Sequence, residues 1–79
     1  MSNDDEKVEL IDFSIKIDIS KFPKILKNII EELEEYEKEN NWVMYYGVSE
    51  ALEASAKQCL VDGVITKGEF ELLLKKYRR

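Results

Sequence analysis

The sequence predicts a small, mostly helical α+β domain: one N-terminal strand over about 11–19, then three helices over about 21–38, 42–61 and 67–78. Three observations support this fold class: a segment of strictly alternating apolar residues, two long stretches with apolar spacings of three and four, and a capping box near the C-terminus. A chain of 79 residues holds a single domain. We expect the polar, acidic residues 1–7 to be a disordered tail and residues 8–79 to fold.

The first element is predicted from alternation. Its odd-numbered positions are all apolar and mostly β-branched, namely Ile11, Phe13, Ile15, Ile17 and Ile19. This period of two is typical of a half-buried strand. If residues 42–46 are helical, the strand has no partner within the chain. An open strand edge is rarely left bare, so the sequence then favours pairing with the same strand of a second copy.

The first helix is expected to begin after Ser20 as N-cap, with Pro23 tolerated in its first turn. It should end near Lys38, because Glu39–Asn41 breaks the pattern and Asn41 can cap the next helix. Its apolar positions form one wide stripe: Phe22, Ile25, Leu26, Ile29, Ile30, Leu33 and Tyr36.

The run 42–46 (WVMYY) is compatible with a short buried strand or with the first turn of a helix. The helix over 42–61 is favoured because one face collects apolar and small residues: Trp42, Tyr45, Ser49, Leu52, Ala56 and Cys59. Gly47 argues against it by about 1 kcal/mol relative to alanine. A second strand at 42–46 remains the alternative. We expect the aromatic residues of this run to lie in the core.

The last two helices are predicted to form a capped hairpin. Gly63 suits the left-handed position that ends a helix, and Thr66 with Glu69 makes a capping box. Ile65 and Phe70 occupy the two positions of a hydrophobic staple.

This stretch resembles two known motifs. Leu60, Asp62-Gly63, Ile65-Thr66, Glu69-Phe70 and Leu74 match the short C-terminal helical hairpin of the SHOCT type, although Gly68 replaces its usual acid. That resemblance implies an interaction or oligomerisation element without catalytic residues. The same letters resemble the second half of an EF-hand loop, but Gln58 and Leu60 would then occupy the first ligand positions. We therefore expect no calcium site.

Charge is unevenly distributed along the first helix. Three lysines stand at its start (Lys21, Lys24 and Lys27), and acids crowd its end, among them Glu31, Glu34 and Glu35. The helix dipole favours the reverse order. Two copies packed antiparallel would place each lysine end beside an acidic end. The acidic run is otherwise suited to a basic protein, or to mimicry of a nucleic-acid backbone. These six residues, with Ile11, Phe13, Ile15 and Ile17, are the candidate interaction residues.

Composition excludes several function classes. The chain has no histidine and one cysteine, Cys59, so the commonest general base, the commonest metal ligands and an intrachain disulfide are missing. We expect no enzyme activity, metal or cofactor, and the absence of a signal peptide or apolar span leads us to expect a cytoplasmic protein.

With a net charge of −5, the sequence favours a non-enzymatic interaction or self-association module, expected to be a homodimer. The alternative is an acidic regulator linked to nucleic acid, acting through the basic C-terminus or by occluding a DNA-binding partner. A strand followed by helices resembles the ribbon-helix-helix topology. Two acids against one base (Asp12, Asp18 and Lys16) disfavour DNA binding by such a strand.

Overall fold

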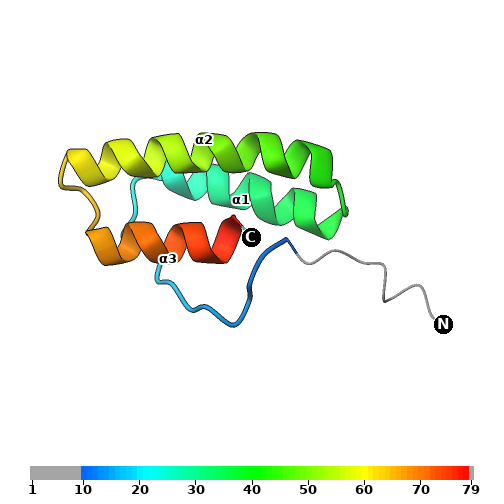
Figure 1. Cartoon of the computed structure of the whole chain (residues 1–79), viewed down its shortest axis with the longest axis horizontal. Helices are drawn as coiled ribbons and strands as arrows, with labels where there is room; N and C mark the ends of the chain where they lie inside the picture. Colours follow the sequence, from blue (N-terminus) through cyan, green and yellow to red (C-terminus); the bar gives the residue numbers. More distant parts are fainter. Residues whose placement is uncertain (1–9, 79) are drawn as a thin grey trace.

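The computed structural model describes residues 10–78, which form three helices: α1 (Lys24–Lys38), α2 (Trp42–Val61) and α3 (Lys67–Tyr77). α1 and α2 lie side by side and antiparallel, and α3 turns back along α2 (Figure 1). The predicted helix over 42–61 is confirmed, and the third helix ends one residue earlier than expected. The tail predicted at 1–7 lies outside the described residues.

The predicted strand over 11–19 is wrong, because residues 10–78 contain no strand and this segment consists of turns and irregular extended chain. Two short side chains explain the difference. Asp12 accepts hydrogen bonds at Oδ1 from both the backbone N–H and the hydroxyl of Ser14, and Asp18 accepts the same pair from Ser20. Such local bonds give the backbone partners that compete with a strand ladder. The pairing of strands between two copies therefore loses its basis.

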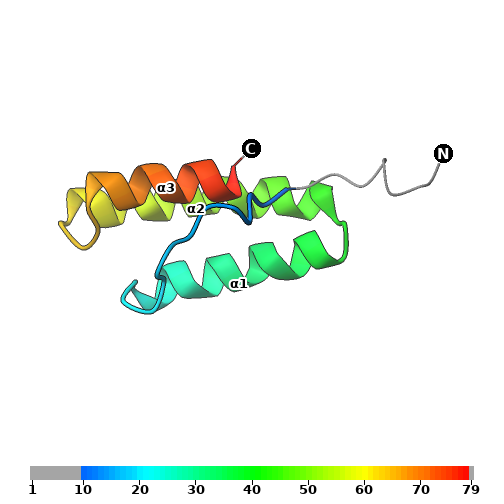
Figure 2. The same ribbon diagram turned by 90° about the horizontal axis from the view of Figure 1, so that it is seen from below.

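The alternation of residues 11–19 reflects a different kind of packing. Ile11 is fully buried, Ile15, Ile17 and Ile19 are partly buried, and Phe13 is 58% exposed. The segment starts against the end of α3, where the Asp12 N–H donates to the Lys76 carbonyl at 2.8 Å. It then crosses to the start of α1 (Figure 2). One edge of this segment thus packs on helices instead of on a neighbouring strand.

α1 begins at Lys24, three residues later than predicted. Pro23 stands at the N-cap position without a side-chain cap, and its carbonyl accepts from the N–H groups of Leu26 and Lys27. The prediction that Ser20 caps α1 is wrong. The Ser20 hydroxyl donates to Asp18 instead, and this bond holds residues 18–20 in a turn outside the helix.

Both helix connections use left-handed residues. Asn40, two residues after the end of α1, has a φ of 57°, and the N–H groups of Asn40 and Asn41 donate to carbonyls of the last turn of α1. Asn41 then caps α2 as predicted, by accepting from the Met44 N–H at 3.3 Å. Gly63, two residues after the end of α2, has a φ of 77°, and the Val64 N–H donates to the Cys59 carbonyl at 2.8 Å in a Schellman motif.

The predicted capping box at the start of α3 is confirmed. Thr66 accepts from the Glu69 N–H at 3.1 Å, and the Glu69 carboxylate accepts from the Thr66 N–H at 2.8 Å. Ile65, ahead of the cap, is buried, and Phe70, one turn into the helix, is partly buried. These positions are those of the expected staple.

The core lies between the three helices and the entering segment. Its buried apolar residues are Leu10, Ile11, Phe22, Leu26, Ile30, Leu33, Tyr45, Leu52, Ala56, Cys59, Ile65, Leu73 and Tyr77. Tyr45 links the entering segment to the end of α3, because its hydroxyl lies 2.7 Å from the Tyr77 carbonyl and 3.2 Å from the Leu10 carbonyl. Burial raises the pKa of Tyr45, with the neighbouring Tyr77 adding to the effect.

Candidate interaction surfaces

Three apolar side chains at the start of α2 form a surface that we call the aromatic patch: Trp42, Val43 and Tyr46. They are 52%, 62% and 47% exposed. The expectation that the aromatic residues here are core holds for Tyr45, which is 1% exposed, and is wrong for Trp42 and Tyr46. The reason is the length of α3, which ends at Tyr77 opposite Tyr45 and leaves the first turn of α2 uncovered.

The aromatic patch is held in a defined geometry. Trp42 and Tyr46 lie one helical turn apart, and their rings meet edge to face with centroids 6.2 Å apart. Tyr46 also meets the buried Tyr45 ring at 6.3 Å. Two contacts thus restrict the Tyr46 ring, so less rotamer entropy is lost if the patch is covered by another surface.

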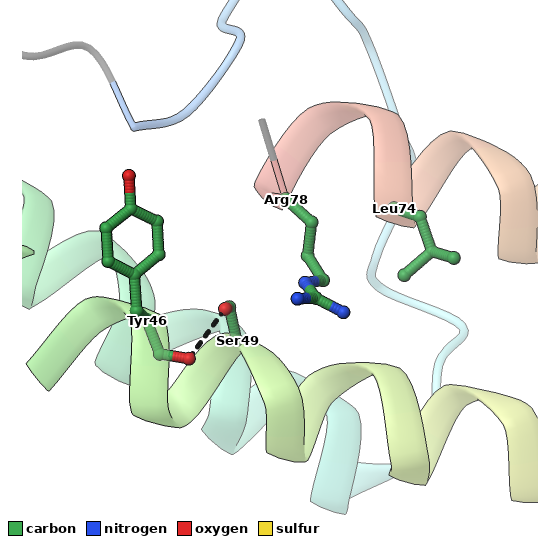
Figure 3. A pocket seen from close by; sticks show the side chains of 4 residues that line it. All are labelled: Tyr46, Ser49, Leu74 and Arg78. Carbon is green, nitrogen blue, oxygen red and sulfur yellow. Dashed lines mark hydrogen bonds between the residues drawn. The ribbon is translucent and has the colours of Figure 1, made fainter.

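A hollow of about 290 Å³ adjoins the aromatic patch between α2 and α3, lined by Tyr46, Ser49, Leu74 and Arg78 (Figure 3). Two of its polar side chains, those of Ser49 and Arg78, already have partners. The Ser49 hydroxyl donates to the Tyr46 carbonyl at 2.8 Å, and the Arg78 guanidinium forms an ion pair with Glu53. The hollow therefore extends the patch and suits an apolar side chain better than a free anion.

The charged residues of α1 lie on its surface. Glu31, Glu34 and Glu35 are exposed, and two shallow hollows are lined mainly by this acidic run. Lys24 is exposed and Lys27 is partly buried. Among the described residues, neither Lys24 nor Glu35 has an ion pair. The segregation of charge seen in the sequence is thus displayed along one helix.

Lys21 is engaged elsewhere, at 2.9 Å from a Glu69 carboxylate oxygen. The hydrogen bond to Glu69 raises the pKa of Lys21, and the same bond is the main cause of the lowered pKa of Glu69. This pair joins the segment before α1 to the first turn of α3. Sequence reasoning missed it, since no local spacing connects residues 48 positions apart.

The structure separates the remaining candidate interaction residues from the acidic run. Ile11 packs inside the protein, Ile15 and Ile17 are partly buried, and Phe13 is exposed. The sequence does not predict the aromatic patch, because the composition of the run 42–46 indicates core residues. A helix cannot bury five consecutive large residues on one face, and this geometric limit is the signal that could have revealed it.

Cys59, Asp62 and Glu69 are the residues of the hairpin whose chemistry bears on a reactive or metal-binding site. Burial raises the pKa of the Cys59 thiol, and Asp62 adds to this, so the thiol stays protonated near neutral pH. Asp62 accepts from the Gln58 amide at 3.0 Å, and Glu69 is bonded to Thr66 and Lys21. Within residues 10–78, no three His, Cys, Asp or Glu side chains lie together as a metal site requires.

Comparison with known proteins gives no relative: no family model, curated protein or solved structure matches this chain. Of the helices in the described part of the chain, none combines the length and apolar character needed to cross a bilayer. The surfaces themselves therefore carry the argument for function.

Proposed function

We propose that this protein is a non-enzymatic protein–protein interaction module that self-associates and presents the aromatic patch to another protein. The observation that carries the proposal is the exposure of Trp42, Val43 and Tyr46 together at the start of α2. Single exposed apolar residues are ordinary on a protein surface, but a contiguous group marks an interaction site.

The composition of the patch supports contact with protein. Tryptophan and tyrosine are the side chains most enriched among the residues that dominate interface energies. Asn41 precedes the patch as the N-cap of α2 and the exposed Glu50 follows it along the helix, which gives the patch a polar rim with one acidic side chain. An apolar centre with such a rim fits a partner surface that carries apolar anchors and basic residues.

The test is capture of partner protein by the full chain and by two variants. Trp42→Ser removes the largest side chain of the aromatic patch, and Val61→Ser removes an apolar side chain that is even more exposed, at 74% against 52%, at the far end of α2. We expect the parent and Val61→Ser to retain the same protein, and Trp42→Ser to lose it by about tenfold or more. Equal capture by all three chains, with circular dichroism showing intact helices, would refute a role for the patch.

The alternative, an acidic regulator linked to nucleic acid, depends on the basic C-terminus. Arg78 is paired with Glu53, and the Lys76 ammonium lies 5.6 Å from the centroid of the Tyr77 ring. These contacts neutralise or occupy two of the basic groups that would meet phosphate. Salt-sensitive retention on heparin, weakened by neutralising Lys75 and Lys76, is the result that would favour this alternative.

A further inference from the structure

α1 carries a second apolar stripe beside the one that enters the core. The buried stripe comprises Leu26, Ile30, Leu33 and Glu37. A neighbouring stripe is formed by the residues that directly precede members of the buried stripe in the sequence. We call its apolar members the α1 seam: Ile25, Ile29 and Tyr36. Ile25 is 55% exposed, whereas Ile29 and Tyr36 are partly buried against the core. The remaining position of this neighbouring stripe, between Ile29 and Tyr36, is the exposed Glu32.

The α1 seam lies on the side of α1 that α3 leaves free. Glu34 adds to the raised pKa of Tyr77 on α3, which places Glu34 on the side of α1 that faces α3. At 100° per residue the seam positions lie on the other side of the helix, beyond the buried stripe. Ile25 instead lines a hollow with Asp62, the C-cap of α2, and with four residues of α2: Ala54, Ser55, Gln58 and Cys59. In Figure 2, α1 lies along the outside of the fold, with the α2–α3 pair on its other side.

We propose that the α1 seam binds the α1 seam of a second copy of this chain in antiparallel orientation, with Lys24 of each copy beside Glu35 of the other. This inference rests on the proposed function and adds the identity of one partner and its site. Lys24 and Glu35 are both exposed at opposite ends of α1, and neither has an ion pair among the described residues.

The order of charge selects the orientation. A two-fold axis midway between Lys24 and Glu35 passes beside Ile29, near the middle of the α1 seam. Rotation about this axis brings the two seams together and creates two Lys24–Glu35 contacts. A parallel pair would instead set lysine beside lysine and glutamate beside glutamate. A two-fold interface must be complementary to itself, and α1 meets that condition only when antiparallel. The reversed charge order, unfavourable for the helix dipole, is thereby explained.

The decisive experiment is a charge swap in the full chain. Lys24→Glu alone puts two glutamates at each contact, and Glu35→Lys alone puts two lysines there. We expect each variant by itself to associate about tenfold or more weakly than the parent in sedimentation equilibrium. Mixing the two variants restores opposite charges at both contacts, so the mixture should recover the parent's association and form a heterodimer.

Matched controls separate this from a general charge effect. Lys57→Glu and Glu71→Lys change the net charge by the same amounts at exposed positions on α2 and α3. They should associate like the parent. Ile25→Asp, at a side chain already 55% exposed, should abolish association while circular dichroism stays helical.

The outcomes distinguish this inference from the proposed function. A dimer that is insensitive to both reversals, or that the mixture fails to restore, overturns the α1 seam but leaves self-association standing. A parent chain that stays monomeric at all concentrations overturns the seam and self-association together. The capture experiment with Trp42→Ser then still tests the aromatic patch independently.

Discussion

Alkaline pH should destabilise this protein through two buried tyrosines. Tyr45 and Tyr77 are each 1% exposed, and burial raises the pKa of Tyr77 to about 12, with Glu34 adding to the shift. Burial raises the pKa of Tyr45 as well. Both phenols are neutral in the folded state, while an unfolded tyrosine ionises near pH 10. Above that pH the unfolded state therefore binds fewer protons, and stability falls as pH rises.

The magnitude follows from these values. At pH 11, a tyrosine that titrates at about 12 when folded and about 10 when unfolded loses about 1.4 kcal/mol of stability. Tyr45 contributes a loss of similar size at the same pH. Together they remove about 3 kcal/mol, a large part of the roughly 5 kcal/mol expected for so small a domain. Below about pH 9 both tyrosines are protonated in the folded and the unfolded state, so none of this stability is lost.

Urea unfolding at a series of pH values between about 8 and 11 measures this loss. Tyr77→Phe should lower overall stability slightly but reduce the dependence on pH, since one titrating group is gone. Tyr46→Phe, at a ring 47% exposed, is the matched control and should keep the parent's pH dependence. A stability that stays level up to pH 11, or an unchanged slope in Tyr77→Phe, would show that the buried tyrosines are not linked to unfolding.

Three substitutions test the local backbone. Gly47→Ala should raise the free energy of unfolding by about 0.5–1 kcal/mol, because the added Cβ meets no atom within 4 Å in a helix interior; an unchanged urea midpoint would contradict this. Gly63→Ala should lower it by about 1 kcal/mol, because φ is 77° there, and a thermal midpoint equal to the parent's would refute the strain argument. Thr66→Ala should cost about 1 kcal/mol through the lost cap, and Thr66→Ser should recover most of it; equal stability of all three chains would dismiss the capping box.

The helical part of this fold was predictable because its signals are local. The α2–α3 hairpin rests on Gly63, Thr66 and Glu69, whose roles depend on neighbours within three residues. Asn41 likewise caps the helix that directly follows it. Such capping interactions join residues that are close together in the sequence, so the residue types alone predict them.

The entering segment was not predictable from alternation alone. Period two describes any extended chain with one buried edge, whether the neighbour is a strand or a helix. The repeated Asp-x-Ser pattern at 12–14 and 18–20 was the available sign of turns. Helix geometry implies that some of the five large residues at 42–46 are exposed, but which of them are exposed depends on where α3 ends relative to α2.

Whether this protein self-associates is best measured by sedimentation equilibrium of the parent chain over a roughly hundredfold concentration range, at low and high salt. We expect a monomer–dimer equilibrium that weakens at high salt, because salt screens the Lys24–Glu35 contacts between copies. A single monomeric mass at every concentration and salt would contradict self-association.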